Sequence, residues 1–186
     1  MTSHPPLLRR RGAMAALLGA TLAACAAEPG APYLAGFGDP VRGAALWAPR
    51  DLADTSRWAG QPARAAEVAA QLELLTDGML TSPRYAPEVD PGVAHLLSEA
   101  RAEMRAYLGI APEAPAEPVI AALNRAARAL HAGSRARTEA ALSAPFFTAG
   151  PLVTLARLEA MPRLPRTAAA AGAAAAEIAR LDRPRR

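Results

Sequence analysis

Residues 62–80 read PARAAEVAAQLELLTDGML and carry the clearest periodicity in the chain. Their large apolar side chains recur with the spacing of one helix face: Val68, Leu72, Leu75 and Met79. Ala65 extends this stripe toward the N-terminus, whereas Glu73 and Asp77 lie off it. The segment therefore predicts an amphipathic helix that packs its apolar stripe against other helices.

A second helix is expected over residues 91–108, because Pro91 favours a helix start and Gly109 favours a helix end. Its apolar residues form one broad face: Val93, Leu96, Leu97, Ala100, Met104, Tyr107 and Leu108. The following stretch APEAPAEP, residues 111–118, contains too many prolines to be helical throughout. We expect it to be a linker.

Further helices are expected after this linker. The first carries Arg125 and Arg128 opposite an apolar stripe made of Val119, Leu123, Ala126 and Leu130. His131 and Gly133 are typical of its end, and Ser134 is expected to cap a short helix that runs to about Leu142. The next helix starts at Pro151 and points Leu152, Leu155 and Leu158 inward.

The two ends of this region are less regular. Residues 167–181 are alanine-rich and predict a helix, since alanine has the highest helix propensity. Residues 41–58 are ambiguous between a helix and irregular structure. We expect a short helix that ends near Pro49, with Trp47 and Trp58 covering the core.

These patterns predict an all-α fold, a compact antiparallel bundle of about five helices over residues 41–186. No alternating strand pattern and no fixed-period repeat is visible in the sequence. The expected core contains Leu72, Leu75, Leu96, Met104, Leu123, Leu130 and Leu155. The chain of 186 residues has the length of one domain.

Charge argues against a nucleic-acid partner. The sequence has a net charge of +4 and its basic residues are all arginine, but three of them precede the apolar N-terminal stretch. After residue 24 there remain 18 arginines against 17 acidic residues, and no basic cluster alternates with aromatic residues. The arginines at 180, 183, 185 and 186 suit a helix C-terminus, with contact to acidic lipid headgroups as the alternative.

The N-terminus has the organisation of an export signal. Arg9, Arg10 and Arg11 precede an apolar stretch, residues 13–24, which is too short to cross about 30 Å of hydrocarbon. Its last residues and the single cysteine, Leu22-Ala23-Ala24-Cys25, resemble the lipobox of bacterial lipoproteins. The resemblance covers only the first 25 residues. It implies a signal peptide over 1–24, lipidation of Cys25, and a flexible lipidated tether over 25–40 that attaches the protein to the membrane.

The same resemblance implies a location in the cell envelope. Ala26, rather than Asp, follows the cysteine, which favours the outer membrane with the protein facing the periplasm. Export is expected by the general route, or by the twin-arginine route that Arg10 and Arg11 resemble. A plain signal peptide and a retained N-terminal anchor helix are the alternatives. A lipidated Cys25 leaves no cysteine for a disulfide.

No residue pattern predicts catalysis, a cofactor or a metal. His95, Glu99 and Glu103 share one side of a helix, but this side points away from the apolar face and predicts a solvated surface. Asp51 and Asp54 are expected to flank a helix start rather than form an acid pair. No Gly-x-Ser-x-Gly motif is present, and residues 36–40 lack the Lys-Ser/Thr of a phosphate-binding loop.

The expected function is therefore non-enzymatic. We expect a membrane-anchored envelope lipoprotein whose helical domain is an interaction or structural module for an envelope protein partner. The first alternative is a periplasmic carrier that holds an apolar ligand within the bundle, and the second is an envelope enzyme. A partner-binding module predicts an exposed apolar patch, and a carrier predicts an enclosed apolar cavity.

Overall fold

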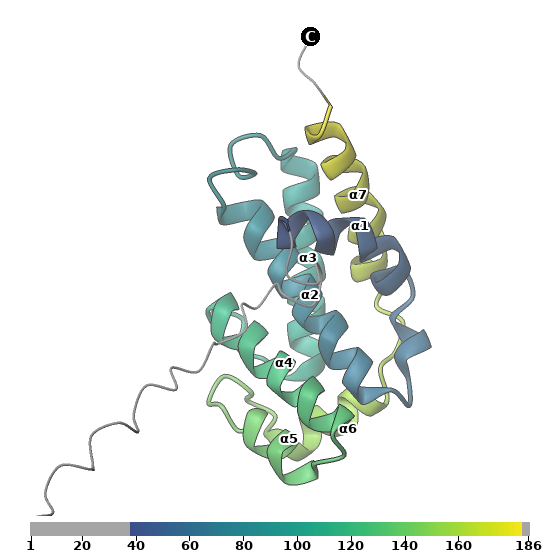
Figure 1. Ribbon diagram of the computed structural model, residues 1–186, viewed down its shortest axis with the longest axis vertical. Coiled ribbons are helices and arrows are strands. Elements are labelled where there is room, and N and C mark those ends of the chain that lie inside the picture. The colour runs from purple at the N-terminus through teal and green to yellow at the C-terminus, as the bar shows by residue number, and fades with distance from the viewer. Residues whose placement is uncertain (1–37, 184–186) are drawn as a thin grey trace, which may run out of the picture.

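The structure is a computed structural model that describes residues 38–183, and this part of the chain is all-helical (Figure 1). The prediction of an all-α fold is confirmed. Residues 38–183 form seven α-helices rather than about five, and one short 3₁₀ helix. These are α1 (Pro40–Leu52), η2 (Thr55–Trp58), α2 (Pro62–Thr81), α3 (Pro91–Leu108), α4 (Ala116–His131), α5 (Arg135–Ala141), α6 (Pro151–Glu159) and α7 (Pro165–Leu181).

Helix α2, the segment with the clearest periodicity, lies at the centre of the fold. It contacts α1, α3, α4 and α6, and twelve of its twenty residues are buried. Leu72, Leu75 and Met79 are fully buried, as their spacing predicted. Glu73 is also buried, although it lies off the apolar stripe, because α3 covers this further side of the helix. Alanine-rich surfaces allow several helices to surround α2 at once.

Helices α1 and α7 lie in the upper half of Figure 1, and α4, α5 and α6 lie in its lower half. Helix α1 packs against α2 and α7, and α7 lies along α3. Helix α4 packs against α2 and α5, and α6 contacts α2, α3 and α5. Within the described residues, no helix combines the length and the apolarity that crossing a membrane requires.

Most of the predicted core residues are buried. Leu123 and Met104 are at most 1% exposed, and Leu155 is 5% exposed, while Leu96 and Leu130 are partly buried against the core. The inward orientation predicted for Leu152 is wrong, because this side chain is 58% exposed. Helix α6 buries one narrow side that contains Thr154, Leu155 and Leu158, and Leu152 lies outside that arc.

The expectation that α1 ends near Pro49 is wrong. The helix continues through Pro49 to Leu52, although proline cannot donate the backbone hydrogen bond of a helix interior. The buried side chains on the core side of α1 extend past this proline and hold the last turn in place: Val41, Ala44, Ala45, Ala48 and Leu52. Their spacing turns Trp47 outward, so that it is 48% exposed, whereas Trp58 is buried as predicted.

Candidate functional site

The side chains of His95, Glu99 and Glu103 do not form a metal site. His95 is exposed, whereas Glu99 forms an ion pair with Arg166 of α7. Glu103 accepts hydrogen bonds from the backbone N–H of Thr167, at 2.9 Å, and from its hydroxyl, at 3.1 Å. The expectation of a purely solvated surface is therefore wrong for Glu103, which holds the start of α7, whereas the ion pair of Glu99 is exposed. Within the described residues, no group of three or more His, Cys, Asp or Glu side chains could hold a metal ion.

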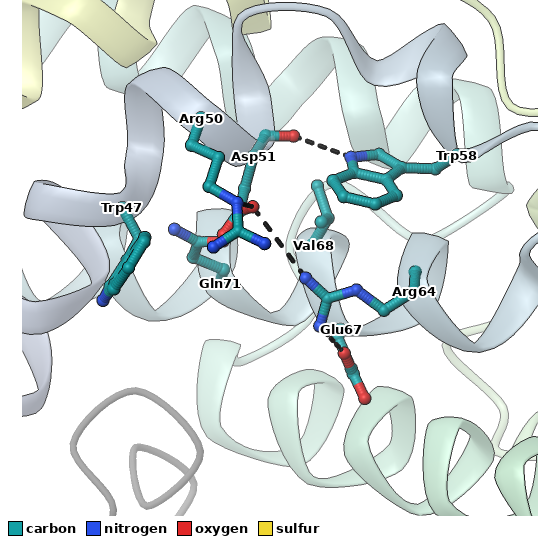
Figure 2. Close-up of a pocket in the computed structure, with 8 residues that line it drawn as sticks. All are labelled: Trp47, Arg50, Asp51, Trp58, Arg64, Glu67, Val68 and Gln71. Carbon is teal, nitrogen blue, oxygen red and sulfur yellow. Dashed lines mark hydrogen bonds and ion pairs between the residues drawn. The ribbon is translucent and has the colours of Figure 1, made fainter.

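A pocket of about 340 Å³ lies where α1, η2 and α2 meet (Figure 2). The pocket is open to solvent on one side, and its lining mixes aromatic, charged and amide side chains: Trp47, Arg50, Asp51, Trp58, Arg64, Glu67, Val68 and Gln71. Its volume lies at the lower end of the range of about 300–1,000 Å³ that is typical of small-molecule sites. The pocket is therefore large enough for a small ligand.

Three helical segments place these side chains. In the last turns of α1, Trp47, Arg50 and Asp51 have the spacing of neighbours on one helix side. Helix η2 brings in Trp58, whose indole N–H donates a 2.8 Å hydrogen bond to the backbone carbonyl of Asp51. On α2, Gln71 donates to the backbone carbonyl of Ala44 at 2.8 Å and so fixes α1 against α2. The pocket walls are thus held by hydrogen bonds between elements.

Asp51 has an unusual environment in this pocket. The residue is only 7% exposed, and its Oδ1 atom is buried without a hydrogen-bond donor. Arg50 Nε lies 3.7 Å from this oxygen and Arg64 Nη2 lies 3.9 Å from it, which is close enough for ion pairs but too far for hydrogen bonds (Figure 2). Burial raises the pKa of the Asp51 carboxyl, and the nearby arginines oppose this rise without cancelling it.

Arginine side chains also lie over both tryptophans. The guanidinium carbon of Arg50 is 5.1 Å from the ring centroid of Trp47. The corresponding distances to Trp58 are 4.8 Å for Arg57 and 5.0 Å for Arg64. Such contacts are attractive because the ring faces carry negative charge density. They keep the arginines of the pocket close to the aromatic rings rather than extended into solvent.

The remaining acidic group of the pocket is already engaged. Glu67 forms an ion pair with Arg64, and its Oε1 lies at a hydrogen-bond distance of 2.8 Å from Nε2 of His131 at the end of α4. The sequence assigned His131 only to a helix end and did not reveal this contact. The lining contains no serine, threonine, cysteine or histidine that could act as a nucleophile. The side chains of the pocket provide one acceptor atom without a hydrogen-bond donor, several donors and an aromatic ring.

The sequence predicted only part of this arrangement. Asp54 does lie at a helix start, where its Oδ1 accepts a 3.1 Å hydrogen bond from the backbone N–H of Ser56 in η2. The same expectation is wrong for Asp51, which lies in the last turn of α1. Asp51 and Trp58 meet only because the chain turns between α1 and α2, and no sequence spacing encodes that turn.

A second hollow of about 440 Å³ lies between α4 and α5. Arg125, Arg128 and Arg137 border it, and alanines of both helices form the rest of its lining. The first two arginines are exposed, as their place opposite the apolar stripe predicted. This hollow contains no buried polar group that lacks a partner, so it provides less evidence for a ligand than the pocket around Asp51.

Comparisons with known proteins add no assignment. No family model matches the chain, and no match is found among curated proteins or among solved structures. Cys25, the residue expected to carry lipid, lies outside the described residues, as does the tether up to residue 37.

Proposed function

We propose that this protein is a lipid-anchored lipoprotein of the bacterial cell envelope whose helical domain is a non-enzymatic binding module. We further propose that the pocket around Asp51 is its binding site. The sequence Leu22-Ala23-Ala24-Cys25 supports the anchor, and the position of Asp51 supports the binding site.

Asp51 carries the proposal because its position is unfavourable for stability in three ways. Its carboxyl is buried, which disfavours the ionised form. Its Oδ1 lacks a hydrogen-bond donor, and an unsatisfied buried polar atom costs about 1–3 kcal/mol. It also lies in the last turn of α1, where the helix dipole disfavours negative charge. A residue that lowers stability in this way is typical of a site that a ligand completes.

The anchor follows from the thiol of Cys25. A diacylglyceryl group on this thiol contributes roughly 0.8 kcal/mol per buried methylene, so that two or more acyl chains anchor a protein firmly. Ala26 after the cysteine supports an outer-membrane location facing the periplasm. The partner or ligand of the module is then a component of the envelope.

Replacing Cys25 with serine tests the anchor. Wild-type protein is expected to partition with membranes and to yield an N-terminal peptide that begins at Cys25 and carries acyl mass. The Cys25→Ser protein lacks the acceptor thiol and should not yield that peptide. An unmodified wild-type N-terminus at Ala26 or beyond, together with soluble periplasmic protein, would contradict the anchor.

The stability of an Asp51→Asn variant tests the binding site. Asparagine keeps the shape of the side chain and removes the buried charge, so the free energy of unfolding should stay unchanged or rise by about 1 kcal/mol. Asp54→Asn is the matched control and should destabilise, because it weakens the cap of η2. If Asp51→Asn destabilises the protein as much as the control does, then Asp51 is structural and the proposed site is wrong.

The carrier alternative has less support. It predicts an enclosed apolar cavity, whereas both hollows described above are open and bordered by arginines. An enzyme would need a set of converging catalytic groups, whereas both carboxylates of the pocket lining lie within ion-pair distance of arginines.

A further inference from the structure

We infer that the pocket around Asp51 takes a neutral, polyhydroxylated ring, which means a sugar unit without a charged substituent. This inference rests on the proposed binding site and adds the chemical class of the ligand. It follows from three properties of the pocket: the unpartnered acceptor, the balance of charges around it, and the exposed aromatic face.

The acceptor sets the first requirement. Oδ1 of Asp51 is buried in the pocket wall and has no donor of its own (Figure 2). A ligand that fills this place must therefore donate a hydrogen bond, from a hydroxyl, an amide or a cationic group. Hydrogen bonds to a charged group contribute about 1.5–3 kcal/mol, more than bonds between neutral groups. A donor placed at this oxygen therefore contributes more binding free energy than a hydrogen bond between neutral groups would.

The surrounding charges exclude ionic ligands of either sign. Arg50 and Arg64 line the pocket and lie over its two tryptophan rings, so a cationic donor would meet two positive charges. An anionic ligand would meet the carboxylates of Asp51 and Glu67. Like charges repel more strongly at a partly buried site than in water. A neutral hydroxyl meets neither repulsion when it takes the place of the exposed Arg50 side chain beside Oδ1, an atom that the pocket wall otherwise buries.

The aromatic face sets the remaining requirement. Trp47 is 48% exposed, and Arg50 lies over its ring. When the exposed Arg50 side chain moves off the ring, the indole offers a flat apolar surface that the C–H face of a sugar ring can cover. The side chains of Arg50 and Arg64 are 57% and 37% exposed, and their guanidinium groups can donate hydrogen bonds to hydroxyl and ring oxygens. A sugar unit combines the hydroxyl edge and the apolar face that the pocket demands.

Sugar titration with tryptophan fluorescence tests this inference on the full lipoprotein in a detergent that carries no sugar. The probes are the neutral disaccharide of N-acetylglucosamine, anionic glucuronic acid and cationic glucosamine. We expect saturable binding of the neutral probe, with a Kd about tenfold lower than that of either charged probe. The chain contains only two tryptophans, Trp47 and Trp58, and both border the pocket, so the signal reports on this site.

Variants assign the effect to the named residues. Asp51→Asn should weaken binding of the neutral probe about tenfold, because a charged acceptor becomes a neutral one. Trp47→Ala should abolish binding, so that the fluorescence of the remaining Trp58 no longer changes when the neutral probe is added. Asp77→Asn and Leu152→Ala are matched controls away from the pocket and should bind as the wild type does.

Other outcomes contradict the inference in distinguishable ways. Tighter binding of glucuronic acid or glucosamine, lost in Trp47→Ala, would overturn the ligand class and leave the binding site standing. No fluorescence change with the neutral probe at about 10 mM would overturn the sugar assignment. The binding site itself is judged separately, from the stability of Asp51→Asn.

Discussion

Arg105 of α3 and Glu73 of α2 form a bidentate ion pair in the core. Nε and Nη2 of Arg105 each donate a 2.7 Å hydrogen bond to one carboxylate oxygen of Glu73, and the two side chains are 5% and 2% exposed. The third nitrogen, Nη1, donates to the backbone carbonyls of Pro112 and Ala114 at 2.7 and 2.9 Å. One guanidinium thus joins α2, α3 and the Pro-rich linker before α4.

Removing this guanidinium should destabilise the protein strongly. Arg105→Met keeps apolar bulk but leaves the Glu73 carboxylate buried without a partner, so we expect a loss of about 3–5 kcal/mol in urea unfolding. Arg101→Met, on the same helix and without such a contact, is the control and should change stability by less than about 0.5 kcal/mol. Equal effects of the two substitutions would show that the pair contributes nothing to stability.

Glu103 should act as the N-terminal cap of α7. The residue before this helix, Leu164, provides no side-chain cap, and the Glu103 carboxylate accepts the free backbone N–H of Thr167 instead. Glu103→Ala should therefore cost about 0.5–2 kcal/mol, the usual range for a lost cap. Glu99→Ala removes only an exposed ion pair and should cost about 0–1 kcal/mol. Thermal unfolding of the two variants shows which substitution lowers stability more. A larger loss of stability in Glu99→Ala would contradict the capping role of Glu103.

Gly78 lies at a close contact between α1 and α2. A Cβ atom at this position would lie 2.2 Å from Cγ2 of Val41, so the two helices can pack this closely only without a side chain there. Gly78→Ala raises helix propensity but overpacks the contact, and we expect a net loss of about 1–2 kcal/mol. The second substitution Val41→Ala should recover part of that loss in a double-mutant cycle. Additive effects would show that the predicted clash does not occur.

Leu123 should be among the residues that stabilise the contact between α4 and α2. Its side chain is fully buried, so Leu123→Ala should lower the free energy of unfolding by about 2–5 kcal/mol. Arg128→Ala is an exposed substitution on the same helix and serves as the control. A shift of the denaturant midpoint no larger than that of the control would contradict the position of α4 in the bundle.

Two carboxylates should affect acid stability in opposite directions. The hydrogen bond from Arg180 lowers the pKa of Glu177, so its stabilising effect is present at neutral pH and is lost as the pH falls through the folded-state pKa. Burial raises the pKa of Asp51, so its destabilising effect is present at neutral pH and disappears on protonation. Between pH 7 and about 3, Glu177→Gln should lose less stability than the wild type, and Asp51→Asn should lose more. Denaturant midpoints measured across this range check both signs, and parallel curves for the two variants would contradict them.

Helix positions could be predicted from the sequence because they depend on the spacing of neighbouring residues along the chain. The recurrence of Leu72, Leu75 and Met79, and the punctuation by Pro91, Gly109 and Pro151, follow from the helix repeat and from backbone geometry. Predictions of which side chains point inward failed for short helices that have apolar residues on more than one side. Trp47 and Leu152 point outward because neighbouring helices already cover the other sides of α1 and α6.

The candidate site could not be predicted in this way, because its members come from separate elements. Asp51 and Trp58 are joined by the turn between α1 and η2, and Arg64 reaches the same place from α2. The burial of Asp51, of Glu73 and of Arg105 depends on which helices cover them. Local spacing along the chain thus specifies the helices and is the basis for the proposed export signal, since both depend on neighbouring residues. Which polar groups are buried, paired or left without a donor depends on packing between distant segments, and only the folded chain defines it.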